Sequence, residues 1–237
     1  MTEPSGKQSE PHGDDHAIDP DVDGPFDIED FEDPAQAEVA RLNLGSVLIP
    51  MPTTGQLQVE LTETGVPSAV WVITPSGRFT IAAYAAPKTT GLWREVAAEL
   101  AEALRKDATK VSVEMGPWGR EVVGSGANGI VRFIGIDGYR WMIRCVINSA
   151  EDTVDAAAAE ARKALADTVI RRGDTPLPVR TPLPVTLPEA MAAQLRQAAA
   201  QQAAAQEGQQ SGPPQPAARR AAPGSAMQQL RTTMGGA

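Results

Sequence analysis

Short apolar runs alternate with turn residues between residues 41 and 172, and this alternation constrains the fold more than any other feature. The runs are rich in β-branched and aromatic residues and are short enough to be β-strands. Glycine, proline and small polar residues separate them, which favours tight connections between neighbouring antiparallel strands. The expected strands are residues 47–49, 57–61, 69–73, 79–84, 111–115, 121–123, 130–136 and 139–147.

Two longer segments have the periodicity of amphipathic helices. Apolar residues recur at every fourth position from Leu92 to Leu104, with charged residues between them. A second stripe, of alanine, valine and leucine, predicts a helix over residues 150–172. The order strands, helix, strands, helix predicts an α+β domain over residues 41–173, with a mostly antiparallel sheet built from two β-hairpin-plus-helix halves.

A shift of 61 residues aligns the two halves and places Gly77 on Gly138. Asp137 and Gly138 lie between apolar runs, a pattern that predicts a two-residue hairpin turn pairing Ile136 with Tyr139. The alignment is compatible with an internal duplication. It is equally compatible with two independent copies of a common strand–strand–helix arrangement.

The net charge of −9 is unevenly distributed along the chain. Residues 1–40 hold 13 acidic residues and one lysine, and they are rich in proline. A segment of this composition buries too little apolar surface to fold, so residues 1–40 are expected to be a disordered acidic arm. Such an arm repels nucleic acids and anionic membranes and attracts basic protein surfaces.

The C-terminal part changes composition twice. Residues 174–188 contain five prolines, which exclude a helix or a central strand. They could form an extended strap on the domain, a mobile linker, or a polyproline-type ligand for another protein. Residues 189–207 are expected to form an Ala/Gln-rich helix, and residues 208–237 a disordered tail.

Residues able to perform catalysis are scarce. The chain has one cysteine, Cys145, within an apolar strand, and its two histidines are His12 and His16. Residues 124–129 match G-x-G-x-x-G, but a strand follows them where a dinucleotide site requires a helix. No catalytic residue, metal site or cofactor is therefore predicted.

Candidate binding residues are few. Trp118 lies in a glycine-flanked loop, where an aromatic ring is hard to explain as core. Arg120, Arg140 and Arg144 could join Trp118 in a small anion-binding patch. The alternative is that these arginines form ion pairs, with Glu60, Glu114 and Glu121 as candidate partners.

Apolar residues interleave with acidic ones near the end of the acidic arm. Phe26, Ile28 and Phe31 form this pattern. Disordered segments of this kind can fold as they dock, on a partner protein or on their own domain. The alternative is a solvated tail.

Several stretches resemble a family of uncharacterised actinobacterial cytoplasmic proteins, classed as a domain of unknown function. The resemblance covers about residues 20–190 and implies a cytoplasmic, single-domain protein without an assigned activity, cofactor or catalytic residue. Asn43 stands where the family is expected to have aspartate. The stretches are Gly24-Pro-Phe-Asp, Arg41-Leu-Asn-Leu-Gly-Ser, Val70-Trp, Ala82-Ala-Tyr-Ala-Ala-Pro-Lys, Leu92-Trp-Arg-Glu-Val, Gly116-Pro-Trp-Gly-Arg-Glu and Arg140-Trp-Met-Ile-Arg-Cys.

The function expected from these features is a non-enzymatic binding, adaptor or chaperone-like module. A protein partner would bind through the acidic arm or the proline-rich strap, whereas nucleic acid and membrane partners are not expected. The alternative is a small-ligand-binding protein or enzyme with a pocket near Trp118, Arg120 and Arg140.

Overall fold

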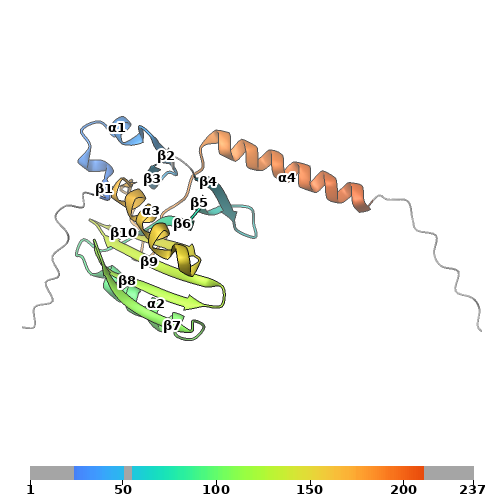
Figure 1. Ribbon diagram of the computed structural model, residues 1–237. Coiled ribbons are helices and arrows are strands. Elements are labelled where there is room, and N and C mark those ends of the chain that lie inside the picture. Colours follow the sequence, from blue (N-terminus) through green and yellow to red (C-terminus); the bar gives the residue numbers. More distant parts are fainter. Residues whose placement is uncertain (1–23, 51–54, 211–237) are drawn as a thin grey trace, which may run out of the picture. The chain divides into compact units, whose positions relative to one another are not determined.

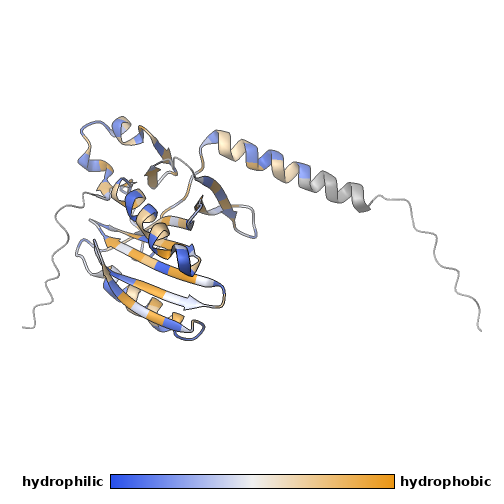
Figure 2. Cartoon of the chain, in the orientation of Figure 1, coloured by the Kyte–Doolittle hydropathy of each residue, from blue (hydrophilic) through white to orange (hydrophobic). Residues whose placement is uncertain are grey.

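The structure is a computed structural model that describes residues 24–50 and 55–210. Its main feature is a seven-stranded antiparallel sheet with the order β4-β5-β6-β10-β9-β8-β7 (Figure 1). Hydrophobic bands along these strands are interrupted by hydrophilic ones (Figure 2). Successive side chains of each strand point to opposite faces of the sheet. The strands are β4 (Gln56–Leu61), β5 (Pro67–Thr74), β6 (Gly77–Ala85), β7 (Lys110–Gly116), β8 (Gly119–Gly126), β9 (Gly129–Asp137) and β10 (Trp141–Ser149).

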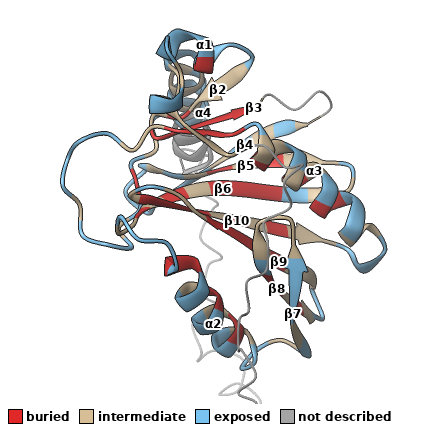
Figure 3. Ribbon diagram, turned by 90° about the vertical axis from the view of Figure 1, so that its left-hand side faces the viewer, coloured by how far each residue is buried: buried red, intermediate tan, exposed pale blue. Residues whose placement is uncertain are grey.

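One helix packs on each face of this sheet (Figure 3). Helix α2 (Leu92–Leu104) contacts β7, β8 and β9, and helix α3 (Val154–Ala166) contacts β6 and β10 from the other side. The short 3-10 helix η2 (Glu151–Thr153) leads into α3. Neighbouring residues of β10 face opposite layers: Ile143 packs with the α3 core, whereas Met142 packs with α2. The predicted α+β fold with a mostly antiparallel sheet is confirmed.

A second, smaller sheet has the order β1-β11-β3-β2. It contains β1 (Phe26–Asp27), β2 (Arg41–Asn43), β3 (Val47–Pro50) and β11 (Val169–Ile170). Strand β1 pairs with β11 in parallel, and the other pairs are antiparallel. Strand β11 lies inside the predicted helix of residues 150–172, so α3 ends earlier than the periodicity predicted.

The expectation that residues 1–40 are disordered is wrong for residues 24–40. They form β1, the 3-10 helix η1 (Ile28–Asp30) and helix α1 (Pro34–Glu38). Their acidic side chains cap these turns: Asp27 accepts a hydrogen bond from the Glu29 amide, and Asp33 accepts one from Ala35. Residues 1–23 of the arm and residues 211–237 of the tail lie outside the described residues.

The register of the β9–β10 hairpin differs from the predicted one. Asp137 pairs with Met142 and Ile136 with Ile143, so the turn is longer than Asp137-Gly138. Gly138 lies against the Trp141 ring, with an added Cβ only 2.2 Å from it, and Arg140 adopts a φ of 63°. The register moves by an even number of residues, which preserves the predicted face of each side chain. In the first half, Thr74 pairs with Gly77 around a Pro75-Ser76 turn.

The proline-rich segment of residues 174–188 runs in an extended conformation along the domain. Strand β6 pairs with β5 as far as Thr80. Beyond Thr80, the proline-rich segment takes the place of β5 along β6. The Leu183 amide donates to the Ala83 carbonyl at 2.9 Å, and the Ala85 amide donates to the Thr181 carbonyl at 2.8 Å. This is the arrangement of an extended strap. Helix α4 (Glu189–Gln210) begins directly after it and belongs to a separate compact unit from residue 190 onward.

Candidate functional site

The start of α2 is fixed to the sheet by Trp93 and Asp137. The Asp137 carboxylate accepts hydrogen bonds from the amides of Gly91 and Trp93, at 2.9 and 3.0 Å. The Trp93 ring covers Gly135, and its Nε1 donates to the Arg120 carbonyl at 2.7 Å. A Cβ at Gly135 would lie 1.9 Å from the ring, so only glycine admits this contact. The position of α2 over β8 and β9 is therefore tightly determined.

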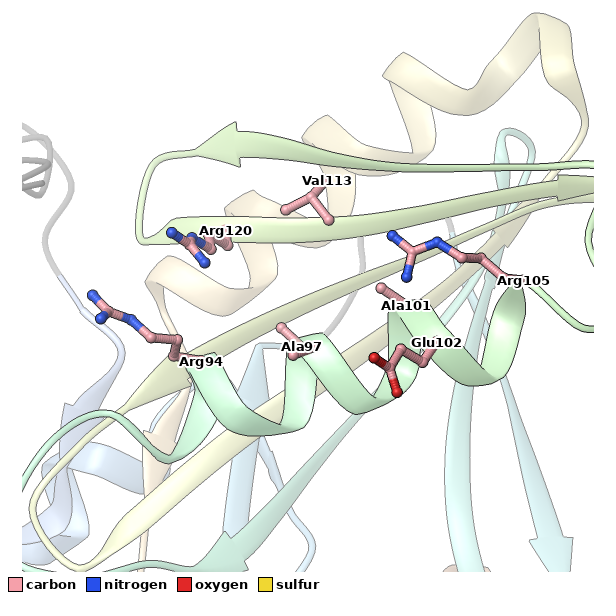
Figure 4. Close-up of a pocket in the computed structure, with 8 residues that line it drawn as sticks. Arg94, Ala97, Ala101, Glu102, Arg105, Val113 and Arg120 are labelled. Carbon is pink, nitrogen blue, oxygen red and sulfur yellow. The ribbon is translucent and has the colours of Figure 1, made fainter.

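A cavity of about 210 Å³ lies between α2, β7 and β8, and we call it the arginine cavity. In Figure 4, Arg94 and Arg105 lie at opposite ends of the helix face, with Ala97 and Ala101 between them and Arg120 across from them. Among the described residues, none of these three guanidinium groups has a hydrogen-bond or ion-pair partner. The lining residues are Arg94, Ala97, Ala98, Ala101, Glu102, Arg105, Val113 and Arg120.

A second cavity, of about 300 Å³, lies on the other flank of α2, and we call it the amphipathic cavity. The Arg144 guanidinium stacks on the Tyr84 ring, 4.9 Å from its centroid. The strap contributes Arg180, whose guanidinium binds Glu95 at 3.1 Å and Glu99 at 2.9 Å. The lining residues are Tyr84, Val96, Glu99, Leu100, Ala103, Met142, Arg144 and Arg180.

The α3 face holds a buried ion cluster. Glu121 of β8 is 1% exposed and accepts hydrogen bonds from Arg132 of β9 and Arg162 of α3, each at 2.7 Å. Glu114 of β7 also binds Arg132, at 3.0 Å. Burial opposes the charge on Arg132, but its hydrogen bond and ion pair with Glu121 raise its pKa above the ordinary value. The cluster joins α3 to three strands, which is a structural role.

Cys145 lies in the core beneath α3 as a free, buried thiol. Burial raises the pKa of this thiol, and the negative charge of Glu121 raises it further. A thiol held in its protonated form is a weak nucleophile. The described residues also contain no group of three or more histidine, cysteine, aspartate or glutamate side chains that could hold a metal ion.

The structure does not bring the predicted anion-binding residues together. Trp118 lies in the β7–β8 turn, where its Nε1 donates to the Gly24 carbonyl at 2.8 Å. Arg120 lines the arginine cavity and Arg144 the amphipathic cavity. Arg140 lies in the β9–β10 turn, and its carbonyl accepts from Arg172 Nε at 3.1 Å. The predicted patch is thus divided among separate places.

The alternative prediction, that Arg120, Arg140 and Arg144 form ion pairs with nearby glutamates, is also wrong. The candidate carboxylates bind other residues. Glu114 and Glu121 bind Arg132, and Glu121 also binds Arg162. Glu60 accepts a hydrogen bond from Trp71 Nε1 at 2.8 Å. Two of the three predicted carboxylates, Glu114 and Glu121, thus form ion pairs, but with Arg132 and Arg162 instead of the predicted arginines.

The three apolar residues of the expected docking arm pack against their own chain. Phe26, Ile28 and Phe31 contact a small core that includes Leu48 and Val169. The rings of Phe26 and Phe31 meet edge to face, with centroids 6.1 Å apart. Docking therefore takes place within the chain, which was one of the two possibilities that the interleaved pattern left open.

Four site residues were not predicted from the sequence: Arg94, Arg105, Tyr84 and Arg180. Arg94 lies in α2 and Arg105 caps its C-terminal end, eleven residues later. That spacing is close to three helical turns, so the two residues share one face. Alanines at positions 97, 98 and 101 leave room between them. Arginines flanking a run of small residues on one helix face were the signal that could have indicated the arginine cavity.

The chain was compared with known proteins and protein families. Among the described residues, no helix is both long and apolar enough to cross a membrane. A search of curated proteins finds no match. The solution structure of cyanobacterial PsbP (CyanoP) from Synechocystis sp. PCC 6803 is similar at 10% sequence identity and a TM-score of 0.35, covering 56% of this chain and 94% of that chain. A family model described as "Protein of unknown function (DUF3710)" matches residues 24–194, and the chain therefore belongs to the DUF3710 family.

Proposed function

We propose that this chain is a non-enzymatic binding module that takes an acidic segment of a partner protein at the arginine cavity. The observation that carries the proposal is that Arg94, Arg105 and Arg120 line one cavity and have no ion-pair partner among the described residues. Guanidinium groups form their strongest contacts with carboxylates, in paired hydrogen bonds. Three such groups spaced along one cavity favour an extended ligand with several carboxylates.

Other arginines of the domain form ion pairs, and this contrast supports the same interpretation. Arg132 and Arg162 are neutralised by Glu121, and Arg180 is bound by two glutamates. At the arginine cavity, Glu102 is the only carboxylate in the lining. Positive charge there exceeds negative charge, so the surface attracts anions.

Strand β7 favours an extended protein segment over a small anion. It is the last strand of the large sheet and pairs only with β8 within the described residues. Val113 and Met115 on this strand are 49% and 52% exposed, so part of its apolar surface is uncovered. An added strand would pair with the β7 backbone, cover these two side chains and bring its carboxylates to the arginines.

A binding role also fits the chemistry of the domain better than the alternative of an enzyme. The pocket expected near Trp118, Arg120 and Arg140 lacks two of its residues, because the Trp118 indole binds Gly24 and Arg140 does not line the arginine cavity. The apolar residues of the acidic arm and the proline-rich strap pack against the domain. The proposal therefore moves the partner site from those segments to the α2–β7–β8 surface.

Fluorescence anisotropy of the full-length chain with a labelled peptide of alternating aspartate and valine tests this function. The triple variant Arg94→Gln, Arg105→Gln, Arg120→Gln should weaken binding about tenfold or more, equivalent to at least 1.4 kcal/mol. The matched control Arg78→Gln, Lys88→Gln, Lys163→Gln removes the same charge at exposed sites elsewhere and should have little effect. Equal weakening in both triple variants would reduce the interaction to a general charge effect.

Two additional measurements in the same assay identify the acidic ligand. Residues 1–23 contain seven acidic side chains that could compete for the same site. Changing Asp14, Asp15, Asp19, Asp21 and Asp23 to asparagine in the full chain should strengthen peptide binding if they compete. Duplex DNA of equal charge should bind more weakly than the peptide, and stronger DNA binding would contradict a protein partner.

We also propose a cytoplasmic location and an actinobacterial origin. Both rest on the family resemblance of the sequence stretches around Trp118 and Trp141. A single buried cysteine is compatible with a reducing compartment. Cell fractionation with an antibody to the chain would test the location.

A further inference from the structure

The amphipathic cavity has the features of a second, independent ligand site. We propose that it binds a small monocarboxylate with an apolar body, with the carboxylate on Arg144 and the body against α2. The cavity lies on the opposite flank of α2 from the arginine cavity, and the two share no lining residue. This inference therefore does not rest on the proposed function.

Arg144 supplies the positive charge. Its Nε is buried and has no hydrogen-bond partner within the described residues. Its neighbours across the strands are Ala82 on β6 and Gly135 on β9, and neither has a side-chain hydrogen-bond acceptor. Stacking on the Tyr84 ring, 4.9 Å away, holds the guanidinium in place but leaves its donors free. A buried charged donor without a partner favours an acceptor from outside the chain.

The carboxylates nearest to this cavity do not neutralise Arg144. Both oxygens of Glu99 accept hydrogen bonds from Arg180 Nη1, each at 2.9 Å. Glu95 accepts from Arg180 Nη2 at 3.1 Å. The strap thus brings its own arginine to these two glutamates. Arg144 is thus the arginine in the lining that has no carboxylate partner within the described residues, and one carboxylate of a ligand can pair with it.

The rest of the lining is apolar. Met142 is 2% exposed, and Val96, Leu100 and Ala103 extend the apolar surface along α2. A volume of about 300 Å³ is at the lower end of the range for ligand sites, so the ligand is small. An apolar body next to a single fixed cation indicates a short-chain or aromatic carboxylate.

The strap closes one side of this site. The Arg180 amide donates to the Ala85 carbonyl at 2.7 Å, and Arg180 adopts a φ of 70°. These contacts place its side chain at the rim, over Glu95 and Glu99. The docked strap thus completes the rim of the cavity with one residue, Arg180.

Isothermal titration calorimetry of the full-length chain with octanoate tests the proposal. The neutral probe of the same chain length is 1-octanol. Octanoate should bind with a saturable signal at least tenfold more tightly than octanol. The variant Arg144→Met should weaken octanoate binding tenfold or more. Arg78→Met is the matched control, because Arg78 stacks on Trp71 at 4.7 Å but does not line the cavity. It should change binding less than twofold.

A second pair of variants keeps the test valid if Arg144→Met fails to fold. Ala103→Leu fills the amphipathic cavity from the exposed side of α2, whereas Ala98→Leu adds the same volume on the other flank. Only the first should weaken octanoate binding. The nitrogen and proton NMR signals of Arg144 Nε–H should shift with octanoate and not with octanol. Absence of saturable octanoate binding, or equal binding of octanol, would overturn the proposal.

Discussion

The indole Nε1 of Trp118 donates a hydrogen bond to the carbonyl oxygen of Gly24 at 2.8 Å, joining residues 94 positions apart. A second indole, that of Trp141, donates to the Asp27 carboxylate at 2.7 Å. Together the two tryptophans hold the start of the described chain against the large sheet. The Phe26 amide then donates to the Thr168 carbonyl at 2.9 Å, which begins strand β1.

Trp118→Phe should remove the hydrogen bond to Gly24 while keeping an aromatic ring in the turn. We expect a loss of about 1 kcal/mol in the free energy of unfolding, measured by urea denaturation. Hydrogen exchange at the Phe26 amide should accelerate because β1 is held less firmly. Trp71→Phe, which loses a bond to the exposed side chain of Glu60, is the control. Unchanged exchange at Phe26 would show that Trp118 does not anchor this segment.

Glu121→Gln should destabilise the fold strongly, because it removes the counter-charge that Arg132 of β9 and Arg162 of α3 share. Breaking a buried ion pair on one side costs about 3–5 kcal/mol, and we expect a loss in that range. Glu114→Gln is the control: its side chain is 46% exposed, so the loss should stay below about 1 kcal/mol. Urea denaturation of both variants measures the difference, and similar losses would contradict a special role for Glu121.

Cys145 should resist an aromatic disulfide reagent in the native protein and react only on unfolding. The pKa of its thiol is raised above the ordinary value of 9.0, so the unfolded chain releases this proton at lower pH than the folded chain. The contribution of Cys145 to stability is therefore complete below about pH 9 and decreases as the pH rises further. Cys145→Ala should lack this loss above pH 9 in urea titrations. A rapid native reaction at pH 8 would contradict the raised pKa.

Gly135→Ala should displace Trp93 and with it the start of α2. An added Cβ would lie 1.9 Å from the indole ring, and overpacking of this kind costs about 1–3 kcal/mol or more. Gly126→Ala is the matched control on the neighbouring strand, since nothing lies within 4 Å of its added Cβ. Thermal unfolding measures stability. Equal melting temperatures for the two variants would mean that α2 can shift without cost.

Part of the candidate sites could be recognised from the sequence. The stripe from Leu92 to Leu104 correctly predicted an amphipathic helix, and Arg120 and Arg144 were named as binding residues before their cavities were known. Periodicity does not reveal which strand a helix covers. Arg120 and Arg144 therefore lie on opposite flanks of α2. The Trp118 indole binds the Gly24 carbonyl of the same chain.

The sequence by itself determined the local elements, because hydrophobic periodicity and turn residues act over a few neighbouring positions. It also determined which side chains of β9 and β10 share a face, since a register error of even length leaves the faces unchanged. Only the tertiary structure decided that the acidic segment around Asp27 folds, because the indole and carbonyl groups that bind it come from distant parts of the chain. The same holds for Glu121, Arg132 and Arg162: composition names possible ion pairs, whereas burial of three elements against one another selects the pairs that form.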